Sequence, residues 1–431
     1  MIRGFARKRL SKLLTGEAEI ALVNRVPSVA ELGEKLREVD ELGIYLHIPF
    51  CDQMCRYCPY NRELYRSEVA REYASAVRRE IDFYADVVGK RPITSLYIGG
   101  GTPTTMLHSG IENILEHLFA TFDMQCDLHM ESHPNDLCPD NLRKISSLGV
   151  RHLSVGVEAL QDRHLETLGR TYTTSEVRTA VDRAVSWGFE CVNVDVMFAL
   201  PHQTYQEIEE TGHALMEMGV DQVAAYPLFS FPYTRMGGRQ GENGSRIPRV
   251  FRRRKMLRVL ESIFYGAGFE RSSVWAFTRK GVPKYCSVTV PLYLGLGASG
   301  GTYLKDIFYL NTFNVAEYID TLRKSGMAIA LSLDLSKKMQ MAGWLYWRVY
   351  ETRFDKADFE ERFGKDFDSV YGGYIKPLAS IGFLEDDGGE IVLSDKGTYW
   401  LHAFEDLFSI EYISKLWGTS RQTPWPEAVV L

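Results

Sequence analysis

From about residue 40 onward the sequence alternates between short runs typical of β-strands and longer amphipathic stretches typical of helices. The strand-like runs lie at residues 43–48, 94–100, 127–132, 151–157, 191–197 and 221–227. The helix-like stretches lie at residues 67–88, 109–120, 139–148, 161–168, 174–188 and 205–218. Because the strand-like runs are almost continuously apolar, and each helix-like stretch is long enough to cross back over a sheet, we expect a parallel sheet covered by helices. The pattern alone leaves an open doubly wound sheet and a full or partial barrel as alternatives.

The pattern changes after residue 229, where a loop rich in glycine and arginine precedes a helix-like segment. We interpret the basic run at residues 252–255 in that segment as a solvated helix face. Residues 290–303 are rich in glycine and fit either a tight turn between packed strands or a backbone surface close to a ligand. From about residue 331, helix-like segments and a hairpin-like stretch at residues 381–397 favour a small winged-helix-like domain.

The composition argues against several classes of protein. Hydrophobic residues make up 45% of the 431 residues, which is too many for a disordered chain, and no uncharged apolar run is long enough for a spanning helix. A net charge of -6 argues against a nucleic-acid partner. The basic N-terminus does not resemble a secretory signal, and it fits either a solvated terminus or a helix on an anionic membrane surface. Seven cysteines form no obvious disulfide framework, so we expect a cytoplasmic protein, with a position peripheral to the membrane as the alternative that the basic N-terminus leaves open.

Three of the cysteines form a triplet, Cys51, Cys55 and Cys58, directly after the first strand-like run. Three thiolates in one tight loop suit an iron-sulfur cluster that keeps one iron open for another ligand. The alternative is a zinc site, which normally has four ligands, so that His47 or His133 would have to supply the fourth. The spacing favours the iron-sulfur cluster over zinc.

Further motifs follow the triplet and its HIPF lead in a fixed order. They are YIGGGTPT (97–104), MESHP (130–134), LSVGVEAL (153–160), LGR (168–170), NVDVMFALPHQT (193–204) and YPLFSFP (226–232). Together these motifs resemble the radical S-adenosylmethionine (radical SAM) superfamily, and within it the anaerobic coproporphyrinogen oxidase-like branch, over roughly residues 40–400. The resemblance implies an α/β fold with a partial (β/α)6 barrel and a [4Fe-4S] cluster that binds S-adenosylmethionine. It also implies reductive cleavage of that cofactor to a 5'-deoxyadenosyl radical, with a low-potential electron donor of the flavodoxin or ferredoxin type.

The resemblance also assigns residues to the site. Cys51, Cys55 and Cys58 correspond to the cluster ligands. The positions that match cofactor contacts are Tyr45, Gly99, Gly100, Gly101, Thr102, Glu131, Glu158, Arg170 and Asp195. Within that set, Glu131, Arg170 and Asp195 match the polar contacts to the amino group, the carboxylate and the ribose.

Two departures separate the chain from members of the branch with known activities. The decarboxylating oxidases carry a further cysteine where this chain has Tyr60, and a glutamine where it has Glu158. The heme chaperones carry an H-N and Y-W element that is missing from residues 285–292. With these two groups set aside, the chain is similar to the class C radical methyltransferases of the same branch. This similarity implies two S-adenosylmethionine molecules and methylation of an sp2 carbon.

We therefore predict a methyltransferase acting on a small planar apolar substrate, such as a quinone of the menaquinone type, a tetrapyrrole such as heme, or a heteroaromatic ring. Tyr226, Phe229, Tyr233 and Trp275 are the candidate aromatic walls for that substrate. The alternatives are a coproporphyrinogen oxidase-like decarboxylase or heme-degrading enzyme, and a heme chaperone-like carrier. The predicted domains are a basic helical segment (1–40), the radical SAM partial barrel (41–235), a barrel extension that includes the substrate region (236–330) and the winged-helix-like domain (331–431).

Overall fold

The computed structural model describes residues 12, 16, 19–37, 39–238, 250–285, 292–324 and 326–431. The first eleven residues of the predicted basic N-terminal segment lie outside this part of the chain, as do most residues of the loop rich in glycine and arginine. None of the described helices combines the length and the apolarity that crossing a bilayer requires.

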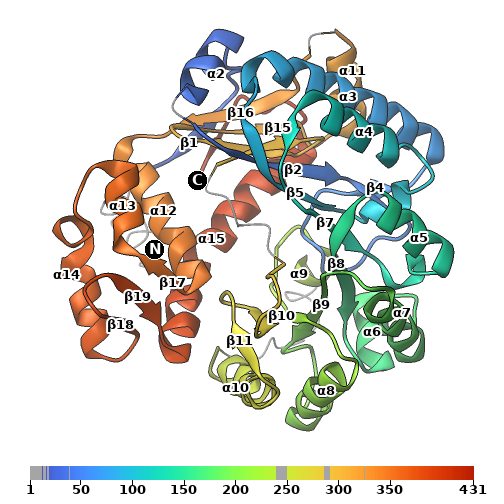
Figure 1. Cartoon of the computed structure of the whole chain (residues 1–431), viewed down its shortest axis with the longest axis vertical. Helices are drawn as coiled ribbons and strands as arrows, with labels where there is room; N and C mark the ends of the chain where they lie inside the picture. The colour runs from blue at the N-terminus through green and yellow to red at the C-terminus, as the bar shows by residue number, and fades with distance from the viewer. Residues whose placement is uncertain are drawn as a thin grey trace.

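A curved sheet of parallel strands forms the body of the protein. Its parallel strands, in spatial and sequence order, are β2 (Leu42–Ile48), β5 (Pro92–Gly100), β7 (Leu128–Ser132), β8 (Val150–Glu158), β9 (Cys191–Phe198) and β10 (Gln222–Pro227). The helices on its outer face are α3 (Ser67–Val88), α4 (Ile111–Thr121), α5 (Pro139–Ser147), α6 (Asp162–Leu168), α7 (Thr174–Trp187) and α8 (Tyr205–Glu217) (Figure 1). The predicted alternation of strands and helices is thus confirmed. The sheet curves around a central space without closing, which selects the partial barrel among the alternatives.

Local sequence signals explain where two of these helices begin. Thr173 and Thr204 each accept a hydrogen bond from the backbone of the glutamate three residues later, and each glutamate bonds back to the threonine backbone. Such a capping box satisfies backbone N–H groups that the first helical turn leaves free. The loops before α7 and α8 are therefore fixed in place. The first joins α6 to α7, and the second joins β9, which borders the central space, to α8.

Additional strands extend the sheet at both ends. Beyond β10 lie β12 (Ala276–Arg279) and β11 (Phe269–Arg271); beyond β2 lie β13 (Tyr293–Leu296), β14 (Gly301–Leu304), β15 (Ile307–Asn311), β16 (Ile329–Asp334), β1 (Ala21–Val23) and β20 (Ala428–Val430). The described part of the glycine-rich stretch, residues 292–303, contains β13, most of β14 and the tight turn between them, which was one of the two alternatives. At that turn Gly297 has a φ of +94°, and a Cβ there would lie 2.3 Å from the Tyr73 hydroxyl.

A buried carboxylate, Glu80 on α3, supports this turn. It accepts hydrogen bonds from the backbone N–H of Gly297 (2.8 Å), from Asn311 Nδ2 (2.6 Å) and from the Tyr318 hydroxyl (2.5 Å). Burial raises the pKa of Glu80 to about 7, while the three hydrogen bonds act in the opposite direction. A single side chain thus ties a helix to a turn more than 200 residues away in the sequence.

The basic run at residues 252–255 is not a solvated helix face, so that interpretation was wrong. It lies on α10 (Val250–Gly266), where Arg254 is buried and donates to Glu261 at 2.6 Å. Arg271 donates to the second oxygen of the same carboxylate at 2.5 Å. Arg253 donates to the backbone carbonyl of Leu228 at 3.0 Å. No pattern in the sequence indicated these partners, because burial of an arginine depends on acceptors that the tertiary fold supplies.

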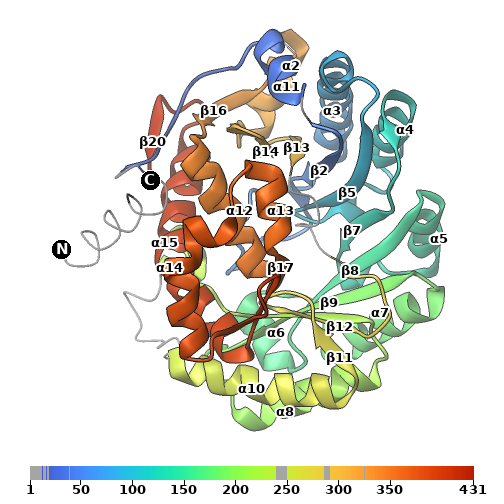
Figure 2. The ribbon, with the colours of Figure 1, turned by 60° about the vertical axis from the view of Figure 1, so that its left-hand side comes forward.

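The C-terminal elements form a second, smaller core. They are α12 (Lys337–Glu351), β17 (Arg353–Asp355), α13 (Lys356–Phe363), α14 (Phe367–Ser380), β18 (Leu384–Asp386), β19 (Glu390–Leu393) and α15 (Asp395–Gln422). The three strands form an antiparallel sheet in the order β17-β19-β18, which includes the predicted hairpin, and Trp344, Phe359 and Phe367 pack in its core. The predicted boundary at residue 331 falls inside β16 of the main sheet. Figure 2 shows these helices in front of the space that the curved sheet surrounds.

Candidate active site

A cavity of about 800 Å³ lies between the carboxyl ends of the parallel strands and the C-terminal helices. Residues that follow or end β2, β5, β7, β8, β9 and β10 line one side, and residues of α12 and α15 line the other. The carboxyl ends of parallel strands are the usual place for an active site in α/β folds, because loops from several strands converge there.

The cysteine triplet lies at one end of this cavity. Cys51, Cys55 and Cys58 all line it, and none is in a disulfide. The loop that carries them is held by the short parallel pair β3 (Phe50–Cys51) and β4 (Glu63–Leu64). Burial raises the pKa of the Cys51 thiol to about 12 and also raises that of Cys58, so a neutral thiol is favoured until a metal centre supplies positive charge.

The two histidines considered as zinc ligands differ in their surroundings. His47 uses both ring nitrogens, with Nδ1 at 2.8 Å from the Tyr45 hydroxyl and Nε2 at 3.0 Å from the carbonyl oxygen of Asn61. It is therefore not available to complete a tetrahedral site with the three thiolates. His133 lines the cavity, where its Nδ1 accepts a hydrogen bond from the backbone of Asn135 at 3.3 Å.

The glycine segment at the end of β5 packs against the cysteine loop. The backbone N–H groups of Gly101 and Thr102 donate to the carbonyl oxygens of Ile48 and Phe50, both at 2.7 Å. A Cβ at Gly101 would lie 2.7 Å from the Phe50 oxygen and 3.0 Å from Cys51 Sγ. Only glycine fits so close to another backbone. Glycine at position 101 thus allows the end of β5 to pack against the cysteine loop and support it.

The predicted cofactor residues divide into two groups. Gly100, Gly101, Thr102, Glu131, Glu158, Arg170 and Asp195 line the cavity. Tyr45 and Gly99 are not among the lining residues. Tyr45 instead bonds to His47, and a Cβ at Gly99 would meet the Tyr97 ring at 2.7 Å.

Of the carboxylates that line the cavity, three lie on strands of the parallel sheet, and neighbouring side chains fix two of these three without neutralising them. Glu131 accepts from the Tyr97 hydroxyl at 2.6 Å and from the Gly100 N–H at 3.0 Å. Asp195 accepts from the Ser154 hydroxyl at 2.8 Å. It also accepts from the Asn193 side chain at 3.1 Å. All of these donors are neutral groups, which orient the carboxylates but leave their charges uncompensated.

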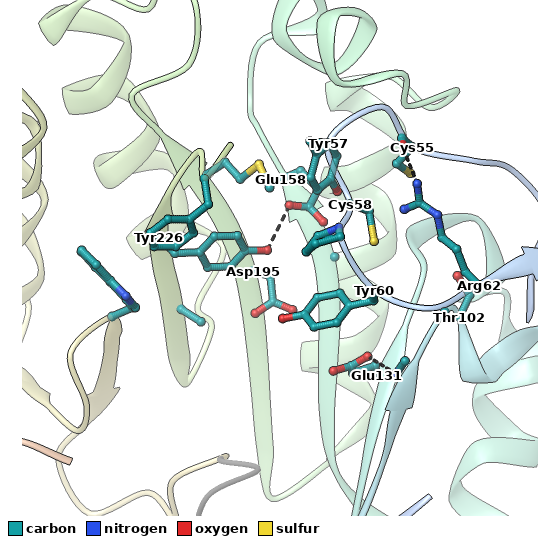
Figure 3. A pocket seen from close by; sticks show the side chains of 18 of the residues that line it. Cys55, Tyr57, Cys58, Tyr60, Arg62, Thr102, Glu131, Glu158, Asp195 and Tyr226 are labelled. Carbon is teal, nitrogen blue, oxygen red and sulfur yellow. Dashed lines mark hydrogen bonds between the residues drawn. The ribbon is translucent and has the colours of Figure 1, made fainter. Parts of the chain in front are cut away.

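Glu158, the third carboxylate, is paired with Arg170 and also accepts from the Tyr226 hydroxyl at 3.3 Å (Figure 3). Its backbone has a φ of +65°, which is uncommon outside glycine and costs energy. Burial raises the pKa of Asp195 to about 7, with the negative charges of Glu158 and Glu131 acting in the same direction. The pKa of Glu131 is also raised, mainly by burial. The ionised forms of these two carboxylates are therefore disfavoured until a cationic ligand binds beside them.

These residues fit an iron-sulfur cluster with S-adenosylmethionine. The three thiolates lie on one loop at the cavity end, and sulfur ligands of this kind hold iron-sulfur clusters. The uncompensated carboxylates, Glu131 and Asp195, suit a ligand with a sulfonium and an ammonium group. The Nε of Arg170 is buried without a hydrogen-bond partner among the described residues, so its N–H can donate a hydrogen bond to a ligand carboxylate.

The far end of the cavity is aromatic. Tyr226, Phe229 and Trp275 line it as predicted, whereas Tyr233 is not among the lining residues and packs against Phe231 and Arg421. Sequence reasoning missed several residues here, which are Tyr346, Tyr350, His402, Asp406, Ile410 and Ile413 on α12 and α15. Aromatic spacing in α15 was visible, but nothing in it indicated that the helix would cover a site more than 100 residues away in the sequence.

Tyr60 and His402 occupy distinctive positions in this cavity. Tyr60 is 52% exposed. Its ring packs against Trp417, with centroids 5.6 Å apart, and lies close to Asp195 and Glu131 (Figure 3). His402 is buried in the wall and accepts a hydrogen bond from the Trp275 indole at 3.1 Å. The cavity thus joins a thiolate end, a charged middle and an aromatic end in one continuous space.

Comparison with known proteins shows which families and solved structures this chain resembles. Residues 45–215 match the Radical SAM superfamily, and residues 352–400 match the HemN C-terminal domain. Curated relatives include the heme chaperone HemW of Bacillus subtilis, which is 25% identical over 360 residues that cover 82% of this chain and 95% of that protein. They also include the oxygen-independent coproporphyrinogen III oxidase of Bradyrhizobium diazoefficiens, which is 22% identical and covers 88% of this chain and 90% of that protein. The solved coproporphyrinogen III oxidase HemN of Escherichia coli has the same fold, with a TM-score of 0.76 and 20% identity over 92% of this chain and 94% of that chain.

These relatives overturn the predicted methyltransferase activity. The chain matches heme chaperones and coproporphyrinogen oxidases over most of its length, and both names point to tetrapyrroles. The prediction was wrong because it was reached by elimination. The substitutions at Tyr60 and Glu158 showed which groups this cavity lacks, but an absent group does not identify the reaction that replaces it.

Proposed function

We propose that this chain, which belongs to the radical SAM superfamily, binds a tetrapyrrole in the aromatic half of its cavity and carries out radical chemistry on it. The observation that supports this proposal is the single cavity that runs from the three cysteines to Tyr226, Phe229 and Trp275. Its volume of about 800 Å³ lies in the upper part of the range for small-molecule sites, which suits two ligands side by side. A large planar substrate at the aromatic end would face a cofactor at the cysteine end.

The half of the cavity next to the three cysteines is assigned to the [4Fe-4S] cluster and one S-adenosylmethionine. Together these groups supply a 5'-deoxyadenosyl radical that abstracts hydrogen. Cys51, Cys55 and Cys58 hold the cluster, and Glu131 binds the ammonium group of the cofactor. The predicted second S-adenosylmethionine has no separate place in this proposal, because the aromatic half is assigned to the tetrapyrrole.

The chain's own side chains orient the two ligands. Arg170, held by Glu158 and Tyr57, presents its free Nε to a carboxylate, and Asp195 accepts hydrogen bonds from the ribose hydroxyls. At the other end Phe229 and Trp275 contact each other and offer ring faces to a flat macrocycle. Helix α15 covers this half, which excludes water from a reactive intermediate.

The test is anaerobic reconstitution with iron and sulfide, followed by reduction with dithionite in the presence of S-adenosylmethionine. Coproporphyrinogen III and heme are supplied separately, and deoxyadenosine and tetrapyrrole products are quantified by mass spectrometry. We expect deoxyadenosine to rise together with a decarboxylated or ring-opened product. Cys55→Ala should abolish both, whereas Cys126→Ala, a free cysteine that does not line the cavity, should preserve them. Deoxyadenosine without any change in either tetrapyrrole would refute the proposed substrate class.

A second candidate function is a heme carrier, and the match to HemW over 82% of this chain and 95% of that protein favours it. The same aromatic half would then hold heme without altering it. Visible titration separates the two candidates, because a carrier retains stoichiometric heme with a shifted Soret band and consumes no S-adenosylmethionine. Heme turnover in the same samples would exclude the carrier.

A further inference from the structure

Three side chains gather at the amino ends of three neighbouring strands, on the edge of the sheet opposite the cavity. They are Asp127, which precedes β7, His152 on β8 and Glu190, which precedes β9, and we call them the amino-end cluster. The strands β7, β8 and β9 are parallel neighbours, so their amino ends meet at one edge (Figure 1). None of the three side chains lines the cavity. The cluster therefore belongs to a part of the molecule that the proposed function does not use.

His152 is the buried member of the cluster, and its ring points at the other two side chains. It is only 3% exposed, yet its Nδ1 has no hydrogen-bond partner among the described residues. Its Nε2 lies 4.0 Å from Asp127 Oδ2 and 3.9 Å from Glu190 Oε2, which is too far for a hydrogen bond. Because buried polar groups are normally hydrogen-bonded, this imidazole needs a partner that the described chain does not supply.

Two features prepare the imidazole to bind a metal ion. The His129 ring stacks on it, with centroids 4.2 Å apart and planes 5° apart, so the orientation of the ring is fixed. Burial lowers the pKa of His152, so the ring is neutral at neutral pH. Neutral imidazole, with one free lone pair, is the form in which histidine binds metal ions.

The two carboxylates carry more negative charge than the fold compensates. Among the described residues, Arg151 is the only arginine or lysine within 4.0 Å of either, with its Nε 3.8 Å from Asp127 Oδ1 and 3.2 Å from Glu190 Oε1. These contacts use one oxygen of each carboxylate, and the other oxygen of each faces His152. One positive charge against two negative charges leaves a deficit, which favours a cation between the free oxygens and the imidazole.

We propose that the amino-end cluster binds one divalent transition-metal ion of the zinc class, with Asp127, His152 and Glu190 as ligands and water completing the coordination. One imidazole with two carboxylates suits Zn²⁺, whereas Mg²⁺ and Ca²⁺ prefer oxygen ligands alone. The three ligand atoms lie within 4.8 Å of one another, and tetrahedral zinc requires roughly 3.4 Å between them. The carboxylate side chains are 53% and 39% exposed, so they are free to rotate inward and close this difference.

The position of the site indicates what the ion does. It joins β7, β8 and β9 at their amino ends, while Glu131, Glu158 and Asp195 of the same strands line the cavity at the other edge. An ion at that distance contacts neither the cofactor nor the substrate, so its role is to stabilise the folded chain through binding. The inference does not depend on the tetrapyrrole proposal.

Zinc titration of the reconstituted protein tests the site while iron occupies the cysteines. The protein is loaded with its iron-sulfur cluster anaerobically, freed of excess metal and titrated calorimetrically with Zn²⁺ in a buffer without chelator. We expect wild type to bind one zinc ion per chain, and the double variant Asp127→Asn, Glu190→Gln to bind it at least about tenfold more weakly. Asp182→Asn combined with Glu209→Gln, exposed acids on α7 and α8, is the matched control and should bind zinc as wild type does. All four side chains are exposed, so the iron content should be the same in the three proteins.

X-ray absorption at the zinc edge identifies the ligands. The first shell should contain nitrogen and oxygen at about 2.0 to 2.1 Å, with scattering from an imidazole ring and no sulfur at about 2.3 Å. Zinc should also raise the unfolding temperature of wild type and of the control, but not that of the Asp127→Asn, Glu190→Gln variant. Equal zinc affinity in wild type and in this variant would overturn the inference, as would a wild-type protein that binds no zinc or a sulfur shell, which would place the zinc on cysteines. Neither experiment uses S-adenosylmethionine or a tetrapyrrole, so a failure of the proposed function would leave both results unchanged.

Discussion

Replacing Asp195 by asparagine is expected to stabilise the cofactor-free protein at neutral pH and to weaken its affinity for S-adenosylmethionine. The fold holds this carboxylate in the cavity with two neutral donors, Ser154 and Asn193, and no cation. Burial, together with the charges of Glu158 and Glu131, raises the pKa of Asp195 to about 7. The ionised form is therefore costly in the folded protein until a cationic ligand arrives.

The direction of the pH effect follows from this raised pKa. Between pH 3.8, the ordinary pKa of an aspartate, and about 7, the folded protein keeps a proton that the unfolded chain releases. Stability therefore falls as the pH rises through this window, and the loss is complete above it. At about 1.4 kcal/mol per pH unit the ceiling is about 4 kcal/mol, of which roughly 2.5 kcal/mol falls between pH 5 and pH 8. Because Asp195 titrates together with two neighbouring carboxylates, we expect an effect of about 1 to 2 kcal/mol over that interval.

The assay is urea unfolding of cluster-free protein under reducing conditions at pH 5 and pH 8. Asp195→Asn should gain about 1 to 2 kcal/mol relative to wild type between the two pH values. Asp182→Asn, an exposed position on α7, is the control and should show no such gain. Titration calorimetry of the reconstituted proteins should show S-adenosylmethionine binding about tenfold more weakly to Asp195→Asn, since each tenfold corresponds to about 1.4 kcal/mol. The reasoning fails if Asp195→Asn follows the same pH dependence as wild type, or if it is less stable than wild type at pH 8.

Three further substitutions test how the site is supported. Gly101→Ala places a Cβ 2.7 Å from the Phe50 carbonyl oxygen, so it should cost about 1 to 3 kcal/mol and reduce the iron bound per chain. Gly33→Ala, in helix α2 (Val29–Leu36) with no atom within 4 Å of the new Cβ, should leave the iron content unchanged and should not lower the stability. Glu80→Ala removes the carboxylate that accepts from Gly297, Asn311 and Tyr318. The free energy of unfolding, measured by urea denaturation, should fall by about 3 kcal/mol, and by less for Glu80→Gln. Glu261→Ala leaves the buried Arg254 without its carboxylate, while Arg271 keeps Asp395, and should cost about 3 to 5 kcal/mol in the same measurement; an unchanged midpoint would show that water replaces the partner.

The parallel body was predictable because each of its signals is local. Strands buried on both faces appear as continuous apolar runs, and the pattern T-x-x-E before α7 and α8 marks a helix start. The cysteine triplet, with the motifs after each strand, likewise placed most candidate residues at one edge of the sheet. Since parallel strands end at the same edge, side chains after successive strands converge without any knowledge of distances.

The second wall of the cavity could not be predicted in this way. Tyr350 and His402 belong to helices whose own sequences indicate only that they pack against something apolar. The partner of each helix depends on the tertiary fold, as does the buried pairing of Arg254 with Glu261. In both cases the sequence shows a residue type suited to several environments, and only a contact distant in the sequence selects one of them.

Inside the cavity, the buried carboxylates of Glu131 and Asp195 meet only neutral donors among the described residues, which favours a positively charged cofactor. Glu261, which does not line the cavity, instead shares its carboxylate between Arg254 and Arg271. The negative charge in the cavity is thus left for a ligand to compensate, whereas the charge of Glu261 is compensated within the fold.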